Sequence, residues 1–197
     1  WQSASPDLFG VIHDLALPAP RTTLPAVRAA RVDASSWAAV SGADRRISVK
    51  VPESWNVSPS TMLPVQVDPV MPLAVGTAPV EPQGVGECGI GPLQALQAVG
   101  PTDAFVGIYV TAGLASWEAT IPERPKTFAS ALPWSMTAMK CTTDVTALLH
   151  SISFEDHGVK LTLLVATGPQ ITDQRRAELV AVLDSLSVSD REPILGA

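Results

Sequence analysis

The placement of proline is the feature of this sequence that most limits the folds it can adopt. The chain of 197 residues carries 18 prolines, close to twice the roughly 5% of an average soluble protein. Most of them fall in residues 1–36, 59–92 and 122–133. Proline inside a helix removes a backbone hydrogen bond and clashes with the preceding turn. Long helices are therefore excluded from these stretches, and we expect regular structure mainly between them.

Several segments carry the pattern of β-strands. Residues 47–51 alternate apolar and polar side chains, which indicates a half-buried strand. Residues 104–110 are almost continuously apolar, which predicts a strand in the middle of a sheet. Residues 63–67 and 73–75 are short apolar runs beside prolines and are predicted as edge strands.

The C-terminal third predicts a β-hairpin. Residues 145–154 and 159–166 are both strand-like, and the polar residues 155–158 between them end in a glycine. Two such runs joined by a short glycine-containing loop are typical of antiparallel neighbours. We therefore expect these two strands to pair.

Two helices are expected to pack on the sheet. The first covers about residues 92–99, with Pro92 at its first position and Gly100 as its stop. The second covers about 173–187, because apolar side chains recur there at helical spacing. Those side chains are Leu179, Val182, Leu183 and Leu186. Hairpin-joined strands with irregularly placed helices predict an α+β fold around a central, mainly antiparallel sheet.

The chain divides into three parts on these patterns. Residues 1–36 are rich in proline and alanine without a sustained period, which predicts a tether. Residues 37–190 are predicted to form a single α+β domain, and residues 191–197 a C-terminal tail. No apolar run reaches the 18 or more residues of a membrane span. Any membrane attachment is therefore expected to come through a segment outside this chain.

Charge and cysteine content limit the partners and the compartment. A net charge of −6 argues against binding a nucleic-acid backbone, which needs a clustered basic face. Cys88 and Cys141 lack the neighbouring ligands of a zinc site. One disulfide between them is the favoured interpretation, and it predicts an extracytoplasmic location. Two free, buried thiols are the alternative.

No motif predicts catalysis, a cofactor or a metal. Residues 84–89 match the letters of a dinucleotide-binding loop, but the βαβ context is missing. His150, Glu155, Asp156 and His157 are read as a strand residue followed by a polar turn rather than as metal ligands. The alternative reading is a small hydrolase that uses His150 as a base with a nearby serine.

Aromatic and apolar side chains outside the predicted strands are candidates for partner contacts. Aromatic residues anchor both protein cores and interfaces. Packing in the core or in loops is the favoured role of four tryptophans, Trp37, Trp55, Trp117 and Trp134. If any are exposed to a partner, the candidates are Trp117 and Trp134 beside the proline-rich crossing, with Phe9 and Ile12 in the tether.

Short motifs between about residues 45 and 190 are informative as a set. They are Pro52–Trp55, Ala104–Val106, Arg124–Pro125, Cys141, Ser153–Gly158, Val165–Gly168 and Val182–Leu186. The set resembles exported or membrane-tethered actinobacterial domains, and its hairpin and closing helix are similar to the Mog1/PsbP-like α/β/α sandwich. This resemblance implies an antiparallel sheet with packed helices at the cell envelope, and it supplies no catalytic residues.

The sequence therefore favours a non-enzymatic, extracytoplasmic domain of a secreted or membrane-tethered protein. Such a domain would bind a protein partner at the cell envelope or an apolar ligand, or serve a structural or sensory role. The small hydrolase remains the alternative function.

Overall fold

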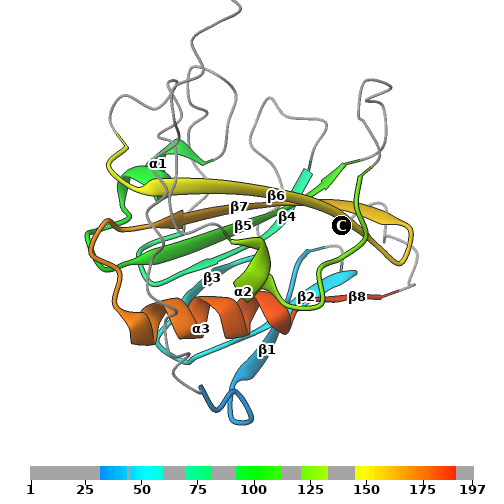
Figure 1. Cartoon of the computed structure of the whole chain (residues 1–197), viewed down its shortest axis with the longest axis horizontal. Coiled ribbons are helices and arrows are strands. Elements are labelled where there is room, and N and C mark those ends of the chain that lie inside the picture. The colour runs from blue at the N-terminus through cyan, green and yellow to red at the C-terminus, as the bar shows by residue number, and fades with distance from the viewer. Residues whose placement is uncertain are drawn as a thin grey trace, which may run out of the picture.

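The structure is a computed structural model, and it describes residues 32–43, 45–59, 70–80, 92–111, 121–132 and 145–189. These ranges contain eight strands in two antiparallel sheets and three helices (Figure 1). The predicted α+β class is confirmed. The tether before residue 32, the tail and both cysteines lie outside the described residues.

The larger sheet has five strands in the order β3-β4-β5-β7-β6, and each neighbouring pair is antiparallel. The strands are β3 (Asn56–Ser58), β4 (Val70–Gly76), β5 (Ala104–Thr111), β6 (Leu148–Asp156) and β7 (Val159–Thr167). β5 lies in the middle of this order, as its nearly continuous apolar sequence predicts. Every side chain from Ala104 to Tyr109 is buried.

The predicted hairpin is formed by β6 and β7. Their register pairs Asp156 with Val159 and Leu148 with Thr167. The two turn residues, His157 and Gly158, have φ angles of 49° and 72°. A two-residue hairpin loop needs this left-handed conformation because it matches the twist of the strands. His157 is exposed in the turn, as expected.

The prediction that residues 73–75 form an edge strand is wrong. These residues belong to the longer strand β4, which lies between β3 and β5. Pro72 beside this run favours an edge strand, since proline cannot donate to a neighbouring strand. The β4–β5 register shifts between Val70 and Leu73, so Pro72 sits at an irregularity where no ladder bond is required. The predicted strand at residues 63–67 lies outside the described residues.

A smaller sheet and a helix cover one face of the larger sheet. The smaller sheet has the order β1-β2-β8, with β1 (Ala38–Ser41), β2 (Ile47–Val51) and β8 (Ser187–Val188). The helix is α3 (Asp173–Asp184), which contacts β2 and β5. Their apolar side chains, including Trp55, form the main core with one face of β4, β5 and β7. The expected packing role of Trp55 is therefore confirmed.

The helices differ from the predicted ones mainly at their ends. α3 begins where Thr172 caps the backbone N–H of Arg175 at 3.1 Å. It ends at Asp184 rather than near residue 187, because the chain turns into β8 and pairs with β2. α1 (Leu93–Gln97) forms inside the expected range. α2 (Phe128–Ala131) was not predicted and lies in a proline-rich stretch.

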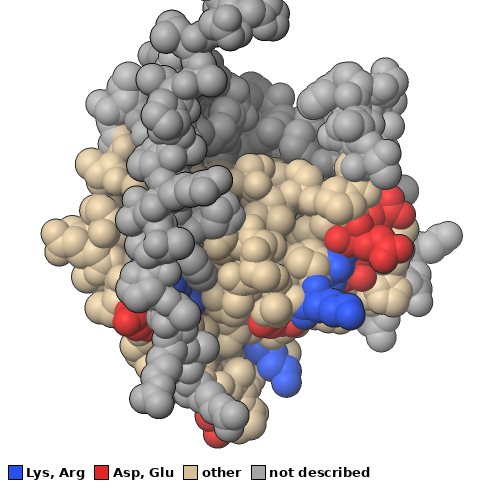
Figure 2. Space-filling view, viewed as in Figure 1, with Lys and Arg blue, Asp and Glu red and all other residues tan. Residues whose placement is uncertain are grey.

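The crossing that carries α2 is fastened to the hairpin end of β6. The backbone N–H of Glu155 donates to Pro122 O at 2.8 Å, and Arg124 N–H donates to Glu155 O at 3.0 Å. The Arg124 side chain forms an ion pair with Asp156 at 2.9 Å. Charged side chains of both signs gather at this end of the molecule, at the right of Figure 2. This contact fixes where the crossing runs and therefore where α2 lies.

A second cluster of buried side chains occupies the opposite face of the larger sheet. It includes Leu96 of α1 together with Met71, Phe105, Tyr109 and Leu164. Tyr109 is 5% exposed, and its buried hydroxyl has no hydrogen-bond partner among the described residues. A buried hydroxyl without a partner loses its hydration and gains nothing in return.

Tyr109→Phe is expected to raise the free energy of unfolding by about 1 kcal/mol, because it removes this unpaired hydroxyl and keeps the ring. Burial also raises the pKa of the Tyr109 phenol. The unfolded phenol then ionises first, so stability should fall as pH rises above about 10. Tyr109 is the single tyrosine of the chain. Its tyrosinate absorbance therefore reports this residue alone. If that absorbance appeared near pH 10 while the protein stayed folded, the expected rise in the Tyr109 pKa would be contradicted.

Candidate functional site

A small pocket lies between the hairpin strands and α3, on the face of the sheet that α3 covers. Its volume is about 110 Å³. Its lining residues come from β6, β7, the loop after β7, α3 and the residue after α2. They are Leu132, Leu148, His150, Val165, Thr167, Pro169, Ile171, Arg176 and Leu179. Most of the lining is aliphatic, and the polar side chains are a histidine, a threonine and an arginine.

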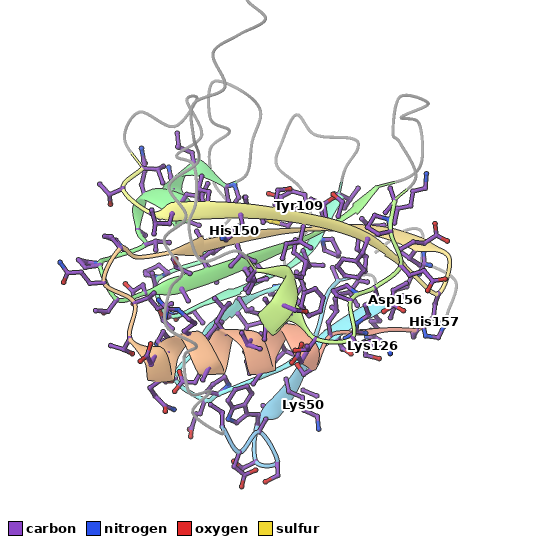
Figure 3. The ribbon with its side chains drawn as sticks, in the orientation of Figure 1. Lys50, Tyr109, Lys126, His150, Asp156 and His157 are labelled. Atoms are coloured by element: carbon purple, nitrogen blue, oxygen red, sulfur yellow. The ribbon has the colours of Figure 1, made fainter. Side chains whose placement is uncertain are left out.

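The strand register builds one wall of the pocket. His150 lies opposite Val165, and Leu148 lies opposite Thr167. Successive side chains of a strand point to opposite faces, so residues two apart share a face. These four side chains therefore lie together on the face toward α3. His150 was singled out from the sequence, and Figure 3 shows it on β6, far from the hairpin turn.

The first half of α3 builds the facing wall. Arg176 and Leu179 are three residues apart, so they lie on the same side of the helix. Leu179 is fully buried in the main core. The Arg176 Nη1 atom forms an ion pair with Asp173 Oδ1 at 3.1 Å. The Arg176 side chain is 23% exposed and that of Asp173 is 68% exposed. The guanidinium therefore lies between the pocket and the water that surrounds Asp173.

Thr167 places a hydroxyl at the end of the strand wall. At 7% exposed, it is the buried polar side chain of the described ranges. A threonine hydroxyl can both donate and accept a hydrogen bond, so Thr167 offers both to a pocket occupant.

The serines next to His150 in sequence do not join it in the pocket. Ser151 and Ser153 alternate to the other face of β6 and are exposed. The Ser153 hydroxyl hydrogen-bonds the Thr162 hydroxyl at 2.9 Å. A nucleophile must lie within hydrogen-bond reach of its base. The structure therefore does not bring these two serines to His150.

The polar residues of the hairpin turn are also separate from His150. His150 and Asp156 are six positions apart on an extended strand, a separation of about 20 Å. Asp156 pairs with Arg124 and lies 3.7 Å from His157 Nε2. Figure 3 shows Asp156 and His157 together at the end of the hairpin. No group of three or more His, Cys, Asp or Glu side chains in the described ranges is arranged to hold a metal ion.

The other candidate residues from the sequence lie outside the described part of the chain. These are Cys88, Cys141, Trp117, Trp134, Phe9 and Ile12. Their predicted roles in a disulfide and in partner contacts stay predictions.

Two residues of the pocket were missed by the sequence analysis. Arg176 stands three positions before Leu179, which extends the apolar stripe of α3 by one turn. An arginine in line with a buried stripe was the available signal. Thr167 ends an apolar strand, and it is buried at a place where residues of α3 and β6, distant from it in sequence, line the same pocket.

The described helices are all too short or too polar to cross a membrane. Comparisons with protein-family models, curated proteins and solved structures give no match to this chain. The Mog1/PsbP-like resemblance therefore stays a prediction, and the pocket geometry is the basis for a functional proposal.

Proposed function

We propose that this domain is a non-enzymatic binding module whose pocket, between β6, β7 and α3, takes a small, mainly aliphatic ligand with a polar end. The observation that carries the proposal is the composition of the pocket. Binding sites for small molecules are concave, mostly apolar and supplied with a few convergent polar groups. Here His150, Thr167 and Arg176 are the polar groups on an aliphatic lining.

The volume limits the size of the ligand. A buried cavity of about 150 Å³ lined by aliphatic and aromatic side chains holds one benzene molecule. The pocket is smaller, at about 110 Å³. Benzene has six non-hydrogen atoms, so we expect the pocket to hold at most about six.

The location and partners of the domain stay part of the same proposal. The pair of cysteines and the resemblance to envelope domains support an extracytoplasmic place, secreted or membrane-tethered. A protein partner at the cell envelope would contact the side chains named for that role in the sequence analysis. Ligand binding in the pocket is compatible with a sensory version of this function.

Leu148→Trp is expected to abolish ligand binding, because the larger side chain fills the pocket from the strand wall. Leu148 is half-buried and lines the pocket, so an indole at this position can extend into the pocket space. The measurement is amide chemical-shift mapping with a panel of small aliphatic acids, alcohols and amides. In the wild type, shifts should centre on Thr167, Ile171 and Arg176.

The matched control is Ser151→Trp. Ser151 lies on the same strand but on the opposite, exposed face. This variant should bind the panel within about twofold of the wild type, a difference of about 0.4 kcal/mol. Shifts that centre elsewhere, or binding that survives in Leu148→Trp, would place the ligand outside the pocket and refute the proposal.

A further inference from the structure

We infer, on the basis of the proposed function, that the ligand is a short aliphatic carboxylate. Its carboxylate would lie against Arg176 and Thr167, and its hydrocarbon end against Val165 and Leu179. Three properties of the pocket support this inference: the charge of its lining, the chemistry of its hydrogen-bond donors and its volume.

The charge of the lining favours an anion over a cation. Among the described lining residues, Arg176 is the side chain with a fixed charge, and no carboxylate is present. Asp173, which pairs with Arg176, is largely in water. Water screens an exposed charge far more than a partly buried one. The pocket therefore faces the positive charge more closely than the negative one.

The donors suit a carboxylate in particular. A guanidinium carries five N–H donors in a planar fork that matches two carboxylate oxygens, and it can serve more than one carboxylate at a time. The Thr167 hydroxyl adds a donor from the strand wall. His150 lies on the neighbouring strand, opposite Val165, and is the remaining polar residue of the lining.

The position of the pocket beside the N-terminal end of α3 also favours an anionic ligand. Arg176 lies in the fourth position of the helix, which begins at Asp173. The N-terminal end of a helix carries a partial positive charge that stabilises nearby anions. The pocket loop residues Pro169 and Ile171 lead directly into this end.

The volume sets the chain length. With room for at most about six non-hydrogen atoms, a carboxylate group leaves space for up to about three further carbons. Isobutyrate lies at this upper limit. Isobutyramide has the same shape without the charge, so the pair separates recognition of the charge from recognition of the hydrocarbon.

The experiment compares these two probes by titration followed with amide chemical shifts. The wild type is expected to bind isobutyrate at least tenfold more tightly than isobutyramide. The advantage of isobutyrate should shrink as salt is added, while the affinity for isobutyramide stays constant. This comparison needs no variant, so it does not depend on how a substitution affects folding.

Arg176→Gln is expected to weaken isobutyrate binding about tenfold and to leave isobutyramide binding within about twofold, because only the charged probe needs the guanidinium. Thr167→Val should weaken the binding of isobutyrate several-fold, because it removes the hydroxyl donor. The matched control is Arg175→Gln, which removes the same charge from the adjacent position. Arg175 pairs with Glu178 at 2.7 Å and does not line the pocket. This control should bind both probes as the wild type does.

The outcomes separate this inference from the proposed function. Equal or tighter binding of isobutyramide by the wild type overturns the carboxylate assignment and leaves the binding module standing. If Arg176→Gln keeps the wild-type preference for isobutyrate over isobutyramide, the role of Arg176 in binding the carboxylate is overturned. Absence of binding for both probes, and for the whole panel of acids, alcohols and amides, overturns the two proposals together.

Discussion

Gly168→Ala is expected to lower the free energy of unfolding by about 3 kcal/mol, the upper end of the usual cost of overpacking. A methyl group at this position would overlap the carbonyl oxygens of Gly100 and Pro101. Both are backbone atoms, so no side-chain rotation relieves the overlap. The measurement is urea unfolding followed by circular dichroism.

The close approach at Gly168 has a structural role that explains the large effect. The N–H of Gly168 donates to Asp103 O at 2.9 Å, and that of Gln170 donates to Pro101 O at 2.8 Å. These bonds join the end of β7 to the turn that leads into β5. Separating the two segments to admit a methyl group would strain both bonds.

Gly158→Ala is the control for Gly168→Ala. A methyl group at Gly158 would meet no atom within 4 Å, but the φ angle there is +72°. The expected cost is about 1 kcal/mol, from the left-handed backbone alone. A loss in Gly168→Ala no larger than that in Gly158→Ala would show that the contact with residues 100–101 is not restrictive.

The parts of the fold that could be predicted depend on neighbours in sequence. The hairpin follows from two strand patterns and a turn of His157 and Gly158, whose left-handed backbone is local chemistry. α3 follows from the helical spacing of its apolar residues and from Thr172. The Thr172 side chain caps the backbone N–H of Arg175, three positions later. β5 follows from its continuous apolar run.

The parts that could not be predicted depend on distant residues. β8 has only two residues, and it exists because Ile47 and Ser48 pair with Val188 and Ser187. The interior place of β4 depends on a register irregularity that only its pairing with β5 reveals. Neither feature has a signal in its own segment, so sequence patterns alone do not find it.

The candidate site shows the same division. His150 could be singled out by residue type, and its place on a strand was predicted correctly. The pocket itself joins residues from β6, β7, α3 and the end of the α2 crossing. That convergence is set by the packing of α3 on the sheet. The sequence therefore pointed to His150 as a candidate base, whereas the structure shows it lining a pocket together with Thr167 and Arg176.

α2 is the clearest case of a distant cause, and it leads to the second large expected effect. Four residues are too few for a helix to be stable by itself. The Phe128 N–H, at the start of α2, donates to Asp184 Oδ1 at 2.7 Å. The Thr127 hydroxyl donates to Asp184 Oδ2 at 3.0 Å. The carboxylate at the end of α3 thus caps a helix that lies more than fifty positions earlier in the chain.

Asp184→Ala is expected to lower the free energy of unfolding by about 2 kcal/mol, measured by urea unfolding. Hydrogen bonds to a charged group contribute about 1.5–3 kcal/mol each, and the partial exposure of this pair lowers that figure. Loss of a negative charge from the C-terminal end of α3 returns less than about 1 kcal/mol. The two lost bonds therefore outweigh the relief.

Two comparisons test whether the effect comes from the cap. Asp184→Asn keeps one acceptor oxygen, so it should lose about half as much as Asp184→Ala. Asp173→Ala removes an exposed aspartate from the other end of α3 and should cost at most about 1 kcal/mol.

A double-mutant cycle tests the cap directly. The loss of unfolding free energy in the Thr127→Ala/Asp184→Ala double variant should be smaller than the sum of the two separate losses, because the two residues share one hydrogen bond. Additive losses, or an Asp184→Ala effect no larger than that of Asp173→Ala, would contradict the distant cap. Since the α2 crossing also carries Leu132 to the pocket, Asp184→Ala is further expected to weaken ligand binding although Asp184 does not line the pocket.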